Sequence, residues 1–250
     1  MIQPIRRKPK PERQKLHRDK LQRLSKTTLL DQAYEVVKEA LMNGQFTPGD
    51  TLVIRQLAAE MGTSIMPVRD ALQKLVAERA LELLPNRTVQ VPLITRTAFD
   101  QLTAIRLRLE ALATECAALR VTAKFMAALR DENDLMIEAV RRQDPAKALE
   151  ANKAFHFTIY RASESELLIS YIESLWLRIG PLLKTPWRLS EGSAVFDRAP
   201  DTHQLVIDAL AMQDPARAAA AITKDISDAA DWYRSQGGIF FSTRDSEEVG

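Results

Sequence analysis

The sequence of 250 residues contains few of the residues on which several fold classes depend. It has 8 glycines and 6% aromatic residues, which disfavours β-sandwiches, β-barrels and glycine-rich phosphate-binding folds. Its single cysteine, Cys116, excludes an intrachain disulfide and a cysteine-based zinc site. Because Cys116 lies in a helical pattern of apolar residues, we interpret it as a small buried residue. These absences favour a mainly α-helical protein.

Long apolar runs are also missing. No stretch approaches the ~18 apolar residues of a transmembrane helix, and the basic N-terminus lacks the apolar segment of a signal peptide. We therefore expect a cytoplasmic protein with no membrane partner. A chain of this length, with 46% apolar and 27% charged residues, is expected to form two domains.

Positive charge is concentrated in residues 1–26, which hold ten lysines and arginines against Glu12 and Asp19. Because the whole chain has a formal charge of +2, this segment carries +8 and the remainder −6. Such a segment cannot bury enough surface to fold alone, so we expect a disordered arm. It is either a solvated tail or an arm that contacts phosphate groups. The phosphate-contacting arm is favoured, because the segment that follows supplies no net positive charge of its own. Residues 27–96 contain 7 basic and 8 acidic residues.

Residues 27–96 are predicted to form a small helical domain with a hairpin. Apolar residues recur at helical spacing near 30–41 and 68–76, and a short helix between them ends at Gly62. Ser64 is a suitable N-cap for the third helix, and Pro67 is tolerated in its first turn. Two short strands around a polar turn follow the third helix. This order is that of a winged helix-turn-helix, although a helical domain without a DNA role has a similar pattern.

Several motifs of this domain match one family of regulators. They are Phe46-Thr47-Pro48-Gly49-Asp50-Thr51-Leu52, Arg55-Gln56-Leu57-Ala58, Gly62-Thr63-Ser64, Pro67-Val68-Arg69-Asp70-Ala71-Leu72 and Leu83-Leu84-Pro85-Asn86-Arg87. Together they resemble the GntR family of bacterial transcription regulators. The resemblance implies that the operator is contacted from the second helix, the start of the third helix and the wing. The implied residues are Arg55, Ser64, Ile65, Pro67, Arg69, Asn86, Arg87 and Thr88.

Two of these positions depart from the family pattern. Ile65 stands where the family commonly has a basic residue, and Thr88 stands where it usually has glycine. An isoleucine side chain can contact a thymine methyl group but cannot donate to a guanine. We therefore expect an operator that differs from the usual consensus, and a less tight turn in the wing.

Residues 97–236 are predicted to form an antiparallel α-helical bundle, with a short tail at 237–250. Asp144-Pro145 and Asp214-Pro215 are each typical of an N-cap followed by proline at the first helical position. Apolar spacing in the first long helix predicts an inward face formed by Phe99, Leu102, Ile105, Leu109, Leu112, Ala113 and Cys116.

Four polar residues fall on stripes of the bundle that are expected to face inward. Asn152 and His156 lie four residues apart on one helix face, His203 lies on another helix and Asp225 on the last. Buried groups of this kind cost free energy unless they are satisfied. A single such histidine is more often a hydrogen-bonded core residue, but four residues on three stripes leave a core role and a metal site equally open.

The bundle carries a second set of motifs, Arg106-Leu107-Arg108-Leu109-Glu110, Asn152 with Phe155-His156, Thr202-His203-Gln204 and Asp214-Pro215-Ala216-Arg217. They resemble the FCD domain, the ligand-binding bundle of FadR-like GntR regulators. The resemblance implies a divalent metal on Asn152, His156 and His203, beside a carboxylate effector. Asp225 replaces the family's last histidine. The set still suits Zn²⁺, Mn²⁺, Ni²⁺ or Fe²⁺, and leaves the identity of the metal open.

Arg106 has two interpretations. It can hold an effector carboxylate bidentately, or it can pair with Glu110, four residues further along the helix. The sequence alone favours neither interaction.

The motifs of an enzyme are missing. There is no Glu-x-x-His pair for a di-iron bundle, no His-Glu-x-x-His, no Gly-x-Ser-x-Gly and no Walker loop. We therefore predict a homodimeric regulator, more commonly a repressor, that binds a pseudo-palindromic double-stranded operator and responds to a small organic acid. The alternatives are a helical-bundle metalloenzyme and an architectural DNA binder without an effector.

Overall fold

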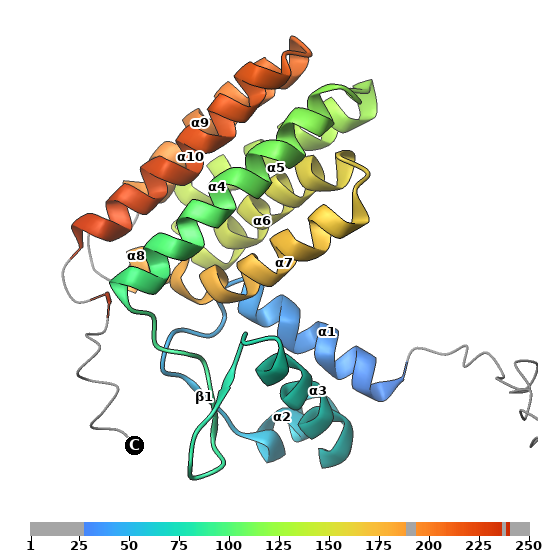
Figure 1. Ribbon diagram of the computed structural model, residues 1–250, viewed down its shortest axis with the longest axis vertical. Coiled ribbons are helices and arrows are strands. Elements are labelled where there is room, and N and C mark those ends of the chain that lie inside the picture. The colour runs from blue at the N-terminus through green and yellow to red at the C-terminus, as the bar shows by residue number, and fades with distance from the viewer. Residues whose placement is uncertain (1–27, 189–193, 237–238, 241–250) are drawn as a thin grey trace, which may run out of the picture.

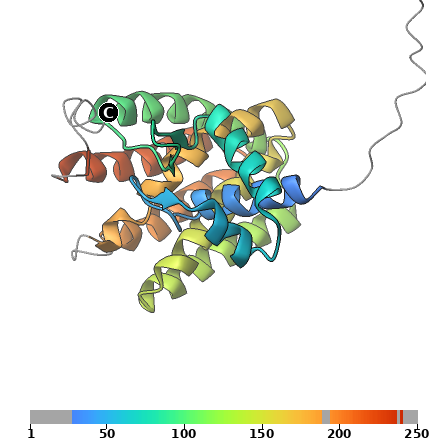
Figure 2. The same cartoon turned by 90° about the horizontal axis from the view of Figure 1, so that it is seen from below.

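A computed structural model describes residues 28–188, 194–236 and 239–240. The predicted arm at 1–26 and most of the tail at 237–250 lie outside these residues. The described chain is a small N-terminal unit, which we call the head, set beneath a bundle of long helices (Figures 1 and 2). None of the described helices is both long and apolar enough to cross a membrane.

The head confirms the predicted winged helix-turn-helix and adds one strand that the sequence pattern did not indicate. That strand, β1 (Thr51–Leu52), pairs antiparallel with β3 (Val89–Gln90), which also pairs with β2 (Glu82–Leu83). The wing is therefore a three-stranded sheet in the order β1-β3-β2. Ser64 precedes α3 as expected, but its side chain makes no capping hydrogen bond. The elements are α1 (Leu29–Met42), β1 (Thr51–Leu52), α2 (Ile54–Glu60), α3 (Ile65–Ala77), β2 (Glu82–Leu83) and β3 (Val89–Gln90).

The bundle is entirely helical, as predicted. The two expected N-caps are present, because Asp144 accepts from the amide of Lys147 and Asp214 accepts from the amide of Arg217. In Figure 1 the long helices lie side by side, with α10 against α4 and α9. The elements are α4 (Arg96–Ala118), α5 (Ala123–Arg141), α6 (Pro145–Ala162), α7 (Glu166–Ile179), the 3₁₀ turn η2 (Gly180–Leu182), α8 (Thr185–Arg188), α9 (Ala194–Ala211) and α10 (Pro215–Ser235).

The predicted inward face of α4 was wrong in part. Ile105 and Leu112 are 50% and 46% exposed, and Cys116 is only half-buried. The buried face instead passes through Arg106 and Glu110. Apolar periodicity assigns charged residues to solvent, so it could not place two buried charges on the inner face. The real face is therefore rotated by about one residue.

The head is held against the bundle where α1 meets α7 and η2. Gly180 has ordinary helical backbone angles, yet a Cβ atom there would lie 2.8 Å from the Cα of Met42 and closer still to the Leu41 carbonyl oxygen. The backbones therefore touch at a distance that only glycine permits. Lys38 of α1 also pairs with Glu173 of α7 at 2.8 Å.

Gly180→Ala should therefore loosen the joint between head and bundle. Overpacking of this kind costs about 1–3 kcal/mol. We expect a lower unfolding temperature and faster hydrogen exchange at the C-terminal end of α1.

Gly62→Ala provides the comparison. Gly62 has a φ of 62° and no atom within 4 Å of a Cβ placed there, so alanine adds backbone strain without crowding. Exchange in α1 should stay unchanged in this variant. Equal exchange in Gly180→Ala and the wild type would contradict the close contact at the joint.

Candidate metal and effector site

The structure brings three of the four predicted metal-site residues together inside the bundle. His156 of α6, His203 of α9 and Asp225 of α10 each offer one ligand atom, and these atoms lie within 4.8 Å of one another. His156 Nε2 is 3.4 Å from Asp225 Oδ2, and His203 Nε2 is 3.9 Å from Asp225 Oδ1. Asn152 is also buried, one turn before His156, and both residues line a cavity inside the bundle.

Burial sets the charge of these groups. It lowers the pKa of His156 well below its ordinary value, with a further contribution from nearby His203, and it lowers the pKa of His203 to about 3. Both imidazoles are therefore neutral, and neither forms an ion pair with Asp225. Burial also raises the pKa of Asp225 to about 6, against a hydrogen bond of 2.5 Å from the Thr202 hydroxyl.

His203 is the most unusual residue of the cluster. Its ring is fully buried and stacks on Phe155 with centroids 3.8 Å apart, yet neither ring nitrogen has a hydrogen-bond partner within the described chain. A buried polar group left unsatisfied costs about 1–3 kcal/mol. The nitrogen that faces Asp225 is suited to a cation, which accepts lone pairs from imidazole and carboxylate alike. The donor set therefore fits a divalent metal.

A buried chain of side chains leads away from the other nitrogen of His156. His156 Nδ1 lies 2.9 Å from the Tyr160 hydroxyl, which in turn contacts Glu110. Glu110 accepts from Arg106 Nε at 2.6 Å and from Arg106 Nη2 at 3.3 Å. Of the two interactions left open for Arg106, the structure thus contains the pair with Glu110.

Tyr160 and Glu110 were not selected from the sequence. Their spacing carried the signal, because Tyr160 continues the stripe of Asn152 and His156, and Glu110 follows Arg106 at the same interval of four residues. A tyrosine at this spacing also fits an ordinary apolar core, and an arginine–glutamate pair also fits a solvent-exposed helix face. The spacing alone therefore did not identify Tyr160 and Glu110 as site residues.

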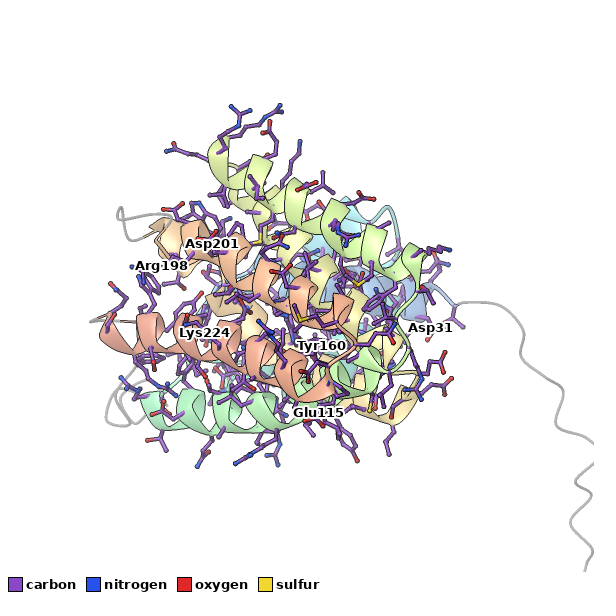
Figure 3. All side chains as sticks on the ribbon, turned by 90° about the horizontal axis from the view of Figure 1, so that it is seen from above. Asp31, Glu115, Tyr160, Arg198, Asp201 and Lys224 are labelled. Carbon is purple, nitrogen blue, oxygen red and sulfur yellow. The ribbon has the colours of Figure 1, made fainter. Side chains whose placement is uncertain are left out.

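The cluster opens onto a cavity of about 200 Å³ between α4, α7, α9 and α10. Thr103 and Trp176 are among the residues that line this cavity, and each carries a buried donor without a partner among the described residues, the Thr103 hydroxyl and the Trp176 indole Nε1. Arg106 lies over the Trp176 ring, with its guanidinium carbon 5.3 Å from the ring centroid. Arg198 lines the cavity from α9 and lies at the margin of the bundle in Figure 3. The cavity is therefore rich in hydrogen-bond donors.

The predicted DNA-contacting residues gather on the head. Arg55 is the second residue of α2, Ser64 to Arg69 span the start of α3, and Asn86 to Thr88 lie in the turn between β2 and β3. Of the eight predicted residues, all have exposed side chains except Pro67 and Thr88, which are half-buried.

The wing turn is closed by two backbone hydrogen bonds. Leu84 and Arg87 form its backbone hydrogen bonds, from Arg87 N to Leu84 O at 2.8 Å and from Leu84 N to Thr88 O at 2.9 Å. The residue with positive φ is Arg87, at 65°. Thr88 therefore occupies a position that does not require glycine, and the expectation of a less tight turn than in the family stays a prediction.

Comparison with known proteins decides the family. Residues 29–91 match the family of bacterial regulatory proteins named gntR, and residues 101–228, half of the chain, match the FCD domain. The chain belongs to the GntR family. It is accordingly a DNA-binding transcription regulator with an FCD domain, and not an enzyme.

Individual members of the GntR family are similar over most of the chain. The HTH-type transcriptional regulator McbR of Escherichia coli is 33% identical over 145 residues, 58% of this chain and 66% of that relative, just under two thirds. The gluconate operon transcriptional repressor of Bacillus subtilis is 27% identical over 80% of this chain and 82% of its own length. The solved structure of E. coli McbR/YncC superimposes with a TM-score of 0.77 at 28% identity, covering 83% and 98% of the two chains.

Asp225→Asn tests the electrostatics of the cluster in metal-free protein. The folded protein holds the Asp225 proton more tightly than the unfolded chain, whose pKa is 3.8. The wild type should therefore lose stability as the pH rises from about 4 to about 6, by up to about 3 kcal/mol. The variant should be more stable than the wild type above pH 6 and equal to it near pH 4.

Thermal unfolding in the presence of a chelator measures this difference. Asp231→Asn is the matched control, because Asp231 lies on the same helix and pairs with Arg234 at the surface. Its pH profile should follow that of the wild type. Parallel profiles for wild type and Asp225→Asn would show that Asp225 is not a destabilising buried carboxylate.

Proposed function

We propose that the protein is a homodimeric repressor whose operator binding responds to a small organic acid, bound beside a divalent metal ion in the bundle. The observation that carries this proposal is His203. Its buried nitrogens lack a partner in the described chain, and one of them faces Asp225 close to His156. A core histidine would have its hydrogen bonds satisfied, whereas a metal ligand keeps a lone pair free.

His156, His203 and Asp225 would hold the metal, with Asn152 as a fourth ligand. Two imidazoles and a carboxylate suit Zn²⁺, Mn²⁺, Ni²⁺ and Fe²⁺. When bound, the cation supplies a fixed positive charge that attracts an anionic ligand into the cavity. Thr202 orients Asp225 by its hydrogen bond.

The lining of the cavity supports a small anion as effector. Its volume of about 200 Å³ is below the usual range for drug-sized ligands, which favours a compact molecule. Thr103 and Trp176 each present an unpartnered donor, and Arg106 and Arg198 add positive charge. A carboxylate has the acceptor atoms that these donors require. One relative is named for a gluconate operon, and gluconate is such an acid.

The head would bind the operator through Arg55, Arg69 and the wing. Arginine near the start of a recognition helix can reach a guanine edge bidentately, and Ile65 can contact a thymine methyl group. We retain the arm at 1–26 as a contributor of phosphate contacts, since the head has no net positive charge of its own.

A second copy of the chain would associate through α4. Ile105, Leu112 and Leu119 are spaced seven residues apart and are 46–72% exposed, so they form an apolar stripe along one helix face. This spacing suits packing against another helix. A dimer would place two recognition helices about 34–36 Å apart on a pseudo-palindromic operator.

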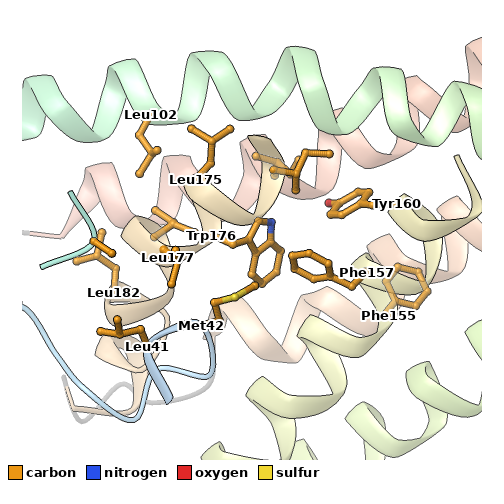
Figure 4. Packing of buried hydrophobic residues seen from close by; sticks show 14 of the residues in the cluster. Leu41, Met42, Leu102, Phe155, Phe157, Tyr160, Leu175, Trp176, Leu177 and Leu182 are labelled. Carbon is orange, nitrogen blue, oxygen red and sulfur yellow. The ribbon is translucent and has the colours of Figure 1, made fainter. Parts of the chain in front are cut away.

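The path from effector to head would run through α7. Trp176 lines the cavity on one side, and Figure 4 shows Met42 of α1 beside it on the other. An effector that changes the position of Trp176 would therefore act on the joint at Gly180. For this to alter operator binding, the effector must bind the two head positions with different affinity.

Arg69→Ala tests the DNA-binding surface. Loss of one bidentate base contact costs about 1–3 kcal/mol, so operator affinity should fall about 10- to 100-fold at constant salt. Arg130→Ala removes an exposed arginine from α5 and is the control for net charge. Fluorescence anisotropy with a labelled operator measures both variants. Equal affinity for Arg69→Ala and wild type would remove Arg69 from the recognition surface.

Thr103→Val tests the effector site, because it removes a hydroxyl and keeps the side-chain volume. Small organic acids, gluconate among them, would first be screened by thermal shift with Zn²⁺ or Mn²⁺. The acid with the largest shift should bind the variant about 10-fold more weakly, and operator release should require correspondingly more of it.

Thr114→Val is the matched control for Thr103→Val. Thr114 is equally buried on α4, but its hydroxyl donates to the Glu110 carbonyl and does not line the cavity. Its affinity for the acid should equal that of the wild type. If no acid shifts the wild type or releases the operator, the proposed organic-acid effector is wrong.

A further inference from the structure

The hydrogen-bond chain behind His156 links α4 to α6 inside the bundle. Arg106 pairs with Glu110, Glu110 contacts the Tyr160 hydroxyl, and Tyr160 lies 2.9 Å from His156 Nδ1. Glu110 and Tyr160 are fully buried, and His156 is 3% exposed. Figure 3 shows Tyr160 in the interior, between the ribbons of the bundle. Burial shields these bonds from bulk solvent, so each proton along the chain has a definite place.

The direction of each bond follows from the chemistry of the groups. A guanidinium only donates and a carboxylate only accepts, so Arg106 donates to Glu110. Glu110 must also accept the O–H of Tyr160. A carboxylate has no hydrogen to donate, so the hydrogen shared between Tyr160 and Glu110 is the phenol's own. That proton is committed to Glu110, and the Tyr160 oxygen can only accept from His156.

His156 must therefore carry its proton on Nδ1. A neutral imidazole has one N–H and one lone pair. The lone pair is then on Nε2, the nitrogen 3.4 Å from Asp225 Oδ2. The opposite tautomer would place an N–H toward the metal position and leave Nδ1 and the Tyr160 oxygen as two facing acceptors.

We propose that Tyr160 and Glu110 are positioning residues that hold His156 as the Nδ1–H tautomer, with Nε2 free to bind a metal. The role of this tautomer in metal binding rests on the proposed metal site. The tautomer itself follows from the hydrogen bonds and is expected in the metal-free protein as well. Arg106 serves the same network by holding Glu110. Partners of this kind behind a metal-binding histidine change metal affinity by about 10- to 100-fold.

The tautomer can be read directly by long-range ¹H–¹⁵N NMR of metal-free, full-length protein labelled at histidine. The chain has only three histidines, His17, His156 and His203, so the spectrum is simple to assign with a His203→Ala variant. We expect His156 protonated at Nδ1 at neutral pH. A wild-type spectrum with His156 protonated at Nε2 would overturn the proposal, even if no variant folds.

Tyr160→Phe and Tyr233→Phe form a matched pair. Tyr233 is also buried and lines the same cavity, but its hydroxyl donates to the Leu182 carbonyl and has no link to His156. The Nδ1–H signature should be lost or mixed in Tyr160→Phe and retained in Tyr233→Phe. Retention in both variants would show that Tyr160 does not select the tautomer.

Calorimetric titration with Zn²⁺ or Mn²⁺ completes the test. Tyr160→Phe should bind the metal about 10- to 100-fold more weakly than the wild type, whereas Tyr233→Phe should stay within about twofold. Equal affinity in both variants would overturn the positioning role toward the metal. A wild type that shows the Nδ1–H tautomer but binds neither cation would refute the proposed metal site and leave the tautomer assignment intact.

Discussion

Burial of polar groups between the long helices is the constraint on which the functional core depends. Removing charges from water costs several kcal/mol per ion, which a buried pair recovers only when its hydrogen bonds are complete. Around Arg106, Glu110 and Tyr160 they are nearly complete, with partners on two helices. Around His203 they are absent within the described chain. The contrast between the satisfied network and the unsatisfied nitrogens of His203 supports the proposal that His203 binds a metal.

The same region is also the contact between the two parts of the molecule. Trp176 separates the cavity from α1, and the glycine at 180 lets the two backbones meet directly. Ion pairs from Lys38 to Glu173 and from Lys153 to Glu39 cross the boundary beside it. The two parts share one packed core, which is the contact that the proposed path from effector to head would use.

Much of the fold could be predicted from local patterns. Helix periodicity depends on neighbours in sequence, as do the two Asp-Pro caps and the turn residues of the wing. The same periodicity placed His156, His203 and Asp225 each on the inward stripe of its own helix. The inner face of α4, strand β1 and the role of Tyr160 could not be predicted in this way. Each depends on partners more than thirty residues away, and a buried charge such as Glu110 has the same sequence signature as an exposed one.

The claim that a cation completes the cluster of His156, His203 and Asp225 is most directly tested by equilibrium dialysis. Protein stripped with a chelator would be dialysed against Zn²⁺ and, separately, Mn²⁺, and the bound metal counted by elemental analysis. We predict one tightly held ion per chain, lost when both histidines are replaced by alanine. A wild type that retains no more of either metal than the double variant would contradict it.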